Sequence, residues 1–211
     1  MKNFTWKTEY SLTAIFVFAV ILFLVPTSFT SKEAGYISKW NEKYNKIEYM
    51  FTAMTAQADA DIVKELKVED DNDKRELLMI KLIQPYLRLE EIPDRRMWYS
   101  PRFMNGKKVS KKDFYYFDTL YKSSNGLIVG VKDIENESDI GPAFMMMVDV
   151  NGAKRPNVWG RDIYGVDIYR DGKIKALGHD EDVDVLRKDC SPTGKGVFCS
   201  YFYRIGGEFT E

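Results

Sequence analysis

The chain has 211 residues, of which 45% are hydrophobic and 30% are charged, with a formal net charge of −1. This composition is rich enough in apolar residues to build a folded core, which argues against a disordered chain. The sequence pI near 6.0 does not favour nucleic-acid binding, and we predict no nucleic-acid partner.

The first element is an apolar segment near the N-terminus. Residues 14–25 contain no polar side chain, and residues 10–29 are almost free of charge. About 20 apolar residues suffice for a helix to cross a bilayer. We therefore predict a leader and transmembrane helix over residues 1–30. The alternatives are a cleaved signal peptide and a buried core helix.

The residues on either side of this segment predict its orientation and fate. Lys2 and Lys7 precede it, which favours an N-terminus in the cytoplasm. A single-pass protein would then carry residues 31–211 as an extracytoplasmic head. Ser28 and Thr30 offer only a poor signal-peptidase site, so the sequence favours a retained anchor over cleavage.

An amphipathic helix is predicted from the capping box Thr30–Glu33 to about residue 58. Its apolar side chains recur every three or four residues, which is the spacing of one helix face. They are Tyr36, Ile37, Trp40, Tyr44, Ile47, Met50, Phe51 and Met54. Pro26 predicts a kink between this stretch and the apolar segment.

A second helix is predicted from Asp73 to about Pro85, with its apolar side formed by Leu77, Leu78, Ile80, Leu82 and Ile83. Residues 90–112 then form a loop. Four lysines in it, Lys107, Lys108, Lys111 and Lys112, indicate a solvated loop.

Short strands are predicted for the second half of the chain, over residues 114–121, 127–132, 143–150, 163–169, 173–177 and 197–205. Turn residues separate them, including Ser124-Asn125-Gly126 and Asp171-Gly172, which indicate hairpins. Helices followed by strands predict an α+β fold with an antiparallel sheet.

The segment 149–162 is the densest cluster of turn residues, and it holds a candidate cation site. Asp149, Asn151, Asn157 and Asp162 could turn their oxygens inward and bind a hard cation such as Ca²⁺. They could equally hydrogen-bond the loop to itself, which we favour. Calcium is therefore a weak expectation, and no other cofactor is predicted.

Cys190 and Cys199 could form one disulfide if the head lies outside the cytoplasm, and the alternative is two free core thiols. A metal site at the cysteines is not favoured, because His179 is the only histidine in the chain. His179 lies in an acidic segment and is predicted to be exposed. A looser calcium site at Asp180, Asp182 and Asp184 stays open, although the EF-hand pattern fails there.

The segment D-x-N-G followed by P-N-x-x-G-x-D, residues 149–162, resembles the head of bacterial type IV pilins and type II secretion pseudopilins. The order of basic leader, apolar helix, amphipathic continuation and antiparallel sheet is also similar. The Cys190 and Cys199 pair resembles the disulfide-bounded loop near pilin C-termini. The resemblance implies a structural subunit of a pilus or secretion assembly in the bacterial inner membrane. Its partners would be membrane lipid and other pilin-like subunits, contacted through the N-terminal helix.

The leader departs from the family pattern. A prepilin leader ends in Gly or Ala before a Phe-like residue, with an acid at the fifth position of the mature helix. Here Asn3 precedes Phe4, Thr8 is the fifth residue, and Glu9 comes one later. A non-polymerising, membrane-anchored binding or adhesion domain is therefore the alternative function. A secreted enzyme is a third hypothesis, but no catalytic residues are predicted.

Overall fold

The computed structural model describes residues 32–56, 72–93, 99–134 and 141–209. The chain divides into two compact units, Met1–Gly35 and Tyr36–Glu211, and the second unit holds the features described below. The predicted leader and transmembrane helix, residues 1–30, lies outside the described residues. Within the described residues, no helix is both long enough and apolar enough to cross a membrane.

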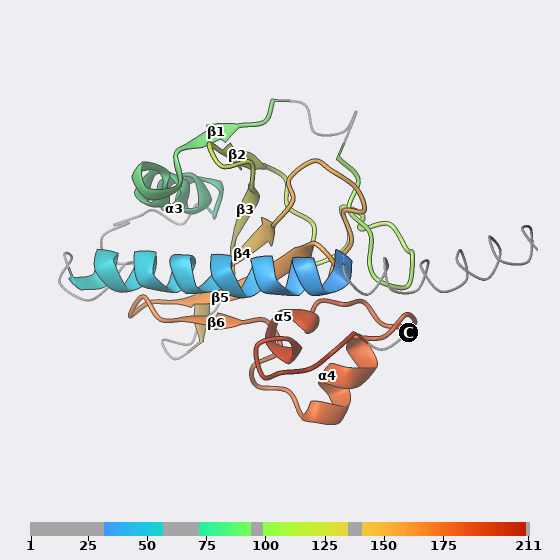
Figure 1. Cartoon of the computed structure of the whole chain (residues 1–211). Coiled ribbons are helices and arrows are strands. Elements are labelled where there is room, and N and C mark those ends of the chain that lie inside the picture. The colour runs from blue at the N-terminus through green and yellow to red at the C-terminus, as the bar shows by residue number, and fades with distance from the viewer. Residues whose placement is uncertain (1–31, 57–71, 94–98, 135–140, 210–211) are drawn as a thin grey trace, which may run out of the picture. The chain divides into compact units, whose positions relative to one another are not determined.

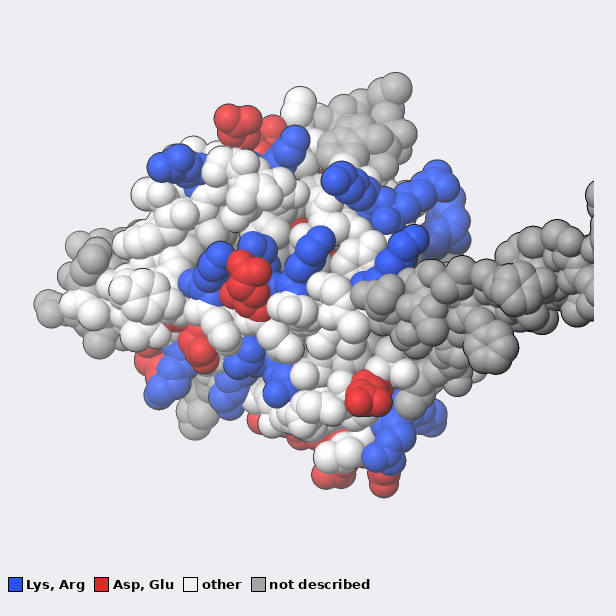
Figure 2. Space-filling model, in the orientation of Figure 1, with Lys and Arg blue, Asp and Glu red and all other residues white. Residues whose placement is uncertain are grey.

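The amphipathic stretch forms a helix over residues 32–56. From Trp40 onward, the side chains that the helical spacing places on one face are buried. They are Trp40, Tyr44, Ile47, Met50, Phe51 and Met54. The opposite face is polar, and Lys and Glu side chains gather over it (Figure 2). Figure 1 shows this helix lying across the sheet.

The second helix, α3 (Asn72–Leu87), is longer than predicted and runs through Pro85. A proline in the last turn removes only one backbone hydrogen bond, so the helix continues for two more residues. The buried face consists of Met79, Ile80 and Ile83, whereas Leu77 is 45% exposed. The predicted apolar side was therefore partly wrong.

The sheet has six antiparallel strands in the order β1-β2-β3-β4-β5-β6, so each strand pairs with the next along the chain. The strands are β1 (Leu89–Glu91), β2 (Tyr121–Ser123), β3 (Ile128–Asp133), β4 (Pro142–Asp149), β5 (Ile163–Tyr169) and β6 (Ile174–Ala176). The predicted α+β class with an antiparallel sheet is confirmed at this level. Both expected hairpins are present, β2–β3 and β5–β6.

Apolar side chains pack on both faces of the sheet. Successive residues of a strand point to opposite faces, and β4 shows this directly. Phe144, Met146 and Val148 belong to the cluster that includes helix 32–56 and α3. Met145 and Met147 belong to a second cluster, formed with residues of the 99–120 segment. Burial on both sides explains why β4 has an almost uninterrupted apolar sequence.

Two predicted strands were wrong. Residues 114–120 form turns and irregular backbone, and only Tyr121–Ser123 is a strand. The segment 197–205 contains the short helix α5 (Cys199–Phe202), which follows α4 (Val183–Asp189). The aromatic content of both segments suits a strand, but tertiary packing decides the conformation of such segments. Ser200, in α5, accepts a hydrogen bond from Trp40 through its backbone oxygen at 2.8 Å.

Candidate functional site

The predicted cation loop connects the end of β4 to the start of β5, and Asp162 organises it. The Asp162 carboxylate accepts the backbone N–H of Asn157 at 2.8 Å and that of Val158 at 2.6 Å. Asn157 adopts a positive φ of 55°, a conformation that asparagine tolerates better than most residues. The carboxylate thus closes the turn on itself, as the self-bonding interpretation predicts.

Asp149 lies on the other side of the same loop. Its carboxylate accepts the backbone N–H of Asn151 at 3.1 Å and the hydroxyl of Tyr99 at 3.0 Å. Asp149 and Asp162 are both fully buried. Burial, and then the charge of Asp162, raise the pKa of Asp149 well above its usual range. Burial raises the pKa of Asp162 to about 6, against the opposing effect of the N–H donors.

The loop therefore brings together all four residues proposed for a cation. The side-chain amide of Asn151 donates to the hydroxyl of Tyr36 at 3.2 Å. Two side-chain oxygens in the described part of the loop, Oδ1 of Asn151 and Oδ1 of Asn157, are buried without a hydrogen-bond partner. Among the described residues, no three His, Cys, Asp or Glu side chains form a group that could hold a metal ion. Calcium binding here stays a prediction.

Cys190 and Cys199 form a disulfide with an S–S distance of 2.06 Å. It joins the end of α4 to the start of α5, and both cysteines are fully buried. The backbone of the 149–162 loop approaches the disulfide closely. A Cβ atom at Gly160 would lie 2.6 Å from Sγ of Cys199, and the φ of Gly160 is +81°. Only glycine lets the loop backbone approach the disulfide this closely.

His179 was expected to be exposed, but its side chain is only 11% accessible. The Nε2 atom lies 2.9 Å from the hydroxyl of Tyr169 and 2.8 Å from Oδ2 of Asp180. The Nδ1 atom lies 3.8 Å from Oδ2 of Asp167. The acidic sequence around His179 predicted exposure, but the chain turns the imidazole inward against β5.

Burial is the largest cause of the pKa shifts of His179, Asp167 and Tyr169. It lowers the pKa of His179 below its usual value, against the opposing charge of Asp180. It raises the pKa of Asp167 to about 6, and Asp180 contributes in the same direction. Burial and then the charge of Asp167 raise the pKa of Tyr169 to about 12. Among the described residues, the side chains that form a hydrogen bond or ion pair with His179 are those of Tyr169, Asp167 and Asp180.

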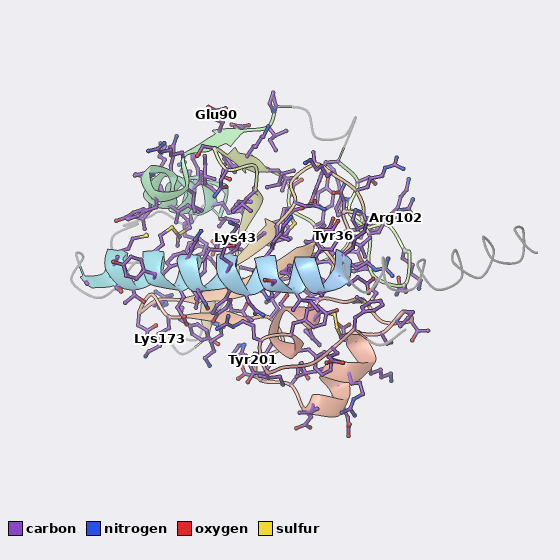
Figure 3. All side chains as sticks on the ribbon, viewed as in Figure 1. Tyr36, Lys43, Glu90, Arg102, Lys173 and Tyr201 are labelled. Carbon is purple, nitrogen blue, oxygen red and sulfur yellow. A yellow bond between two sulfur atoms is a disulfide. The ribbon has the colours of Figure 1, made fainter. Side chains whose placement is uncertain are left out.

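A pocket of about 470 Å³ opens beside this cluster. Six of its lining residues carry polar groups and come from three segments: Tyr44 from helix 32–56, Lys175, His179 and Asp180 from β6 and the turn after it, and Tyr201 and Arg204 from α5 and its C-terminal side. Tyr201 lies below helix 32–56 in the view of Figure 3. Sequence analysis missed this pocket, because no local pattern joins residues so far apart in the chain.

Comparison with protein-family models, with curated proteins and with solved structures finds no match to this chain. The functional assignment therefore rests on the sequence pattern and on the geometry of the described residues.

Proposed function

We propose that this protein is a pilin-like or pseudopilin-like structural subunit, anchored in the bacterial inner membrane by the helix predicted within residues 1–30, with its head outside the cytoplasm. The observation that carries the proposal is the helix 32–56, which has one face buried in the head and the other exposed. A subunit of this kind works by packing its N-terminal helix against neighbouring subunits, so no reaction is required of the head.

Specific contacts fix this helix to the sheet. The indole of Trp40 stacks on Tyr164, with ring centroids 4.8 Å apart and an interplanar angle of 13°. The hydroxyl of Tyr44 donates to the backbone oxygen of Ile174 in β6 at 3.2 Å. Stacking and buried hydrogen bonds both restrict sliding of the helix along the sheet. These contacts keep one face of the helix buried and the other available to a neighbouring subunit.

The disulfide supports the proposed location. Disulfides persist in oxidising compartments, which include the bacterial periplasm and the cell surface, and are rare in the cytoplasm. Cys190 and Cys199 form such a bond. The two lysines ahead of the apolar segment, Lys2 and Lys7, favour the same orientation.

The alternative is a membrane-anchored head that binds or adheres but never polymerises. Two observations favour it: Asn3 stands where a prepilin leader has Gly, and the head carries a pocket of about 470 Å³. Mass spectrometry of the intact protein from native membranes separates the two functions. A chain that begins at Phe4 supports an assembling subunit, whereas an intact Met1 supports the non-polymerising form. A chain that begins near Ser31 contradicts both.

Crosslinking tests assembly directly. A photoreactive residue in place of Tyr49, whose side chain on helix 32–56 is 76% exposed, would capture a neighbouring subunit. The matched control places the same residue at Lys173, on the exposed β5–β6 turn. A ladder of multimers from the helix position supports packing through this helix. Monomers at both positions, in membranes where the partner subunits are expressed, contradict it.

A further inference from the structure

The pocket beside His179 is lined by two cations, Lys175 and Arg204. The ammonium of Lys175 lies 4.9 Å from the centroid of the Tyr169 ring, and the guanidinium of Arg204 lies 3.8 Å from that of Tyr44. Arg204 also donates to Oδ1 of Asn45 at 2.9 Å. Within the described residues, neither cation forms an ion pair with a carboxylate. The aromatic faces hold both cations in place.

The lining of the pocket carries one excess positive charge. Lys175 and Arg204 contribute two positive charges, and Asp180 contributes one negative charge. His179 is neutral near pH 7, because burial lowers its pKa. Asp167 lies at Nδ1 of the imidazole and does not line the pocket, but it faces Lys175 across the β5–β6 pair, and the charge of Lys175 lowers its pKa against the larger effect of burial. A ligand with a single negative charge would neutralise the lining, whereas a doubly charged phosphate would reverse its sign.

The pocket also offers a hydroxyl and an apolar surface. The Tyr201 side chain makes no hydrogen bond in the described part of the chain. Ile205 lines the same pocket and is 47% exposed, so it offers apolar surface to a ligand. The volume of about 470 Å³ lies within the range of small-molecule sites.

We propose that this pocket binds a monocarboxylate with a short aliphatic body. The carboxylate would accept hydrogen bonds from Arg204, Lys175 and the hydroxyl of Tyr201, and the aliphatic part would cover Ile205. Arginine forks match the geometry of a carboxylate, which can accept two parallel N–H bonds. The ligand could be a free acid or the C-terminal carboxylate of a polypeptide. The site does not depend on whether the chain polymerises.

The single histidine provides a direct reporter of binding. The full chain in detergent micelles, labelled with ¹³C-histidine, gives one imidazole signal. N-acetyl-leucine should shift this signal saturably, whereas the neutral N-acetyl-leucinamide should not. The acid should also raise the pKa of His179, because a nearby negative charge favours the imidazolium form. Equal effects of the acid and the amide, or no saturable shift with the acid, would overturn the proposal.

A short peptide that ends in leucine distinguishes the two sources of the ligand. If it binds more tightly than N-acetyl-leucine, and if amidation of its C-terminus abolishes binding, the ligand is a polypeptide terminus. Equal affinity of the peptide and the single amino acid supports a free acid. Both results support a carboxylate site.

Single substitutions test which side chains bind the carboxylate. Arg204→Gln and Lys175→Met should each weaken N-acetyl-leucine binding by roughly tenfold or more, as expected for the loss of a charged hydrogen-bond donor. Lys173→Met is the matched control, because Lys173 lies in the same hairpin and pairs with Asp171 at 2.6 Å, outside the pocket. Unchanged affinity in Lys175→Met contradicts the proposal even if Arg204→Gln fails to fold.

Discussion

We expect the free energy of unfolding to depend on pH through Asp167. Its carboxyl group lies next to His179, and its side chain is 15% exposed. Burial raises its pKa to about 6, from about 3.9 in an unfolded chain. The folded state therefore holds this proton more tightly than the unfolded state. Protonation of Asp167 therefore increases the free energy of unfolding as pH falls from 7 to 5, and this gain is lost again as pH rises through about 6.

The size of this effect follows from the two pKa values. Between pH 7 and pH 5 the folded carboxyl group takes up most of a proton, whereas the unfolded one stays largely ionised. The difference corresponds to a gain of about 1 kcal/mol in the free energy of unfolding. Asp162, with its pKa also raised to about 6, acts in the same direction. His179 opposes both, because its lowered pKa makes its contribution decline as pH falls through about 6.5.

Urea unfolding of the chain in detergent, at pH 7, 6 and 5, measures the effect. Asp167→Asn should reduce the gain between pH 7 and pH 5 by about 1 kcal/mol relative to the wild type. Asp171→Asn is the matched control on the next turn, because its lowered pKa keeps its titration below this range. If Asp167→Asn has the same pH dependence of stability as the wild type, or if both variants change it equally, Asp167 does not cause this pH dependence.

Three further outcomes test the packing, the disulfide and the loop. Trp40→Ala should lower the free energy of unfolding, measured in urea, by about 3–5 kcal/mol, because Trp40 is fully buried. Tyr49→Ala is the control at an exposed position of the same helix, and it should change this free energy by less than about 0.5 kcal/mol. Joint replacement of Cys190 and Cys199 by alanine should cost about 2–3 kcal/mol, measured in the same way. Calcium should leave the melting temperature unchanged relative to EGTA if the 149–162 loop only bonds to itself, whereas a rise would indicate a cation site in this loop or at Asp180, Asp182 and Asp184.

Several elements of the fold could be predicted from local sequence. The bounds of β5 match the predicted 163–169, because its alternating side chains are bounded by turn residues on both sides. The Asp171-Gly172 turn predicted the β5–β6 pairing, and Gly172 adopts the positive φ that such a turn requires. The helical spacing of Trp40, Tyr44 and Ile47 likewise identified the buried face of helix 32–56.

The segment 197–205 shows where local sequence fails. Its aromatic residues suit a strand, yet Cys199–Phe202 is a helix tied to α4 by the disulfide and to helix 32–56 by the bond from Trp40 to Ser200. These contacts involve partners up to 160 residues away. No window of sequence contains both sides of such a contact, so propensity alone could not indicate it.

The periodic elements and the turn chemistry of the 149–162 loop follow from the local sequence, since both depend on neighbours a few residues apart. The surroundings of His179 arise only when distant segments pack together. Burial against β5 reverses its predicted exposure and shifts the pKa values of its neighbours. The pocket with Lys175 and Arg204 is likewise a product of the fold. Desolvation and charge act through space, and the separation of these residues along the chain carries no information about either.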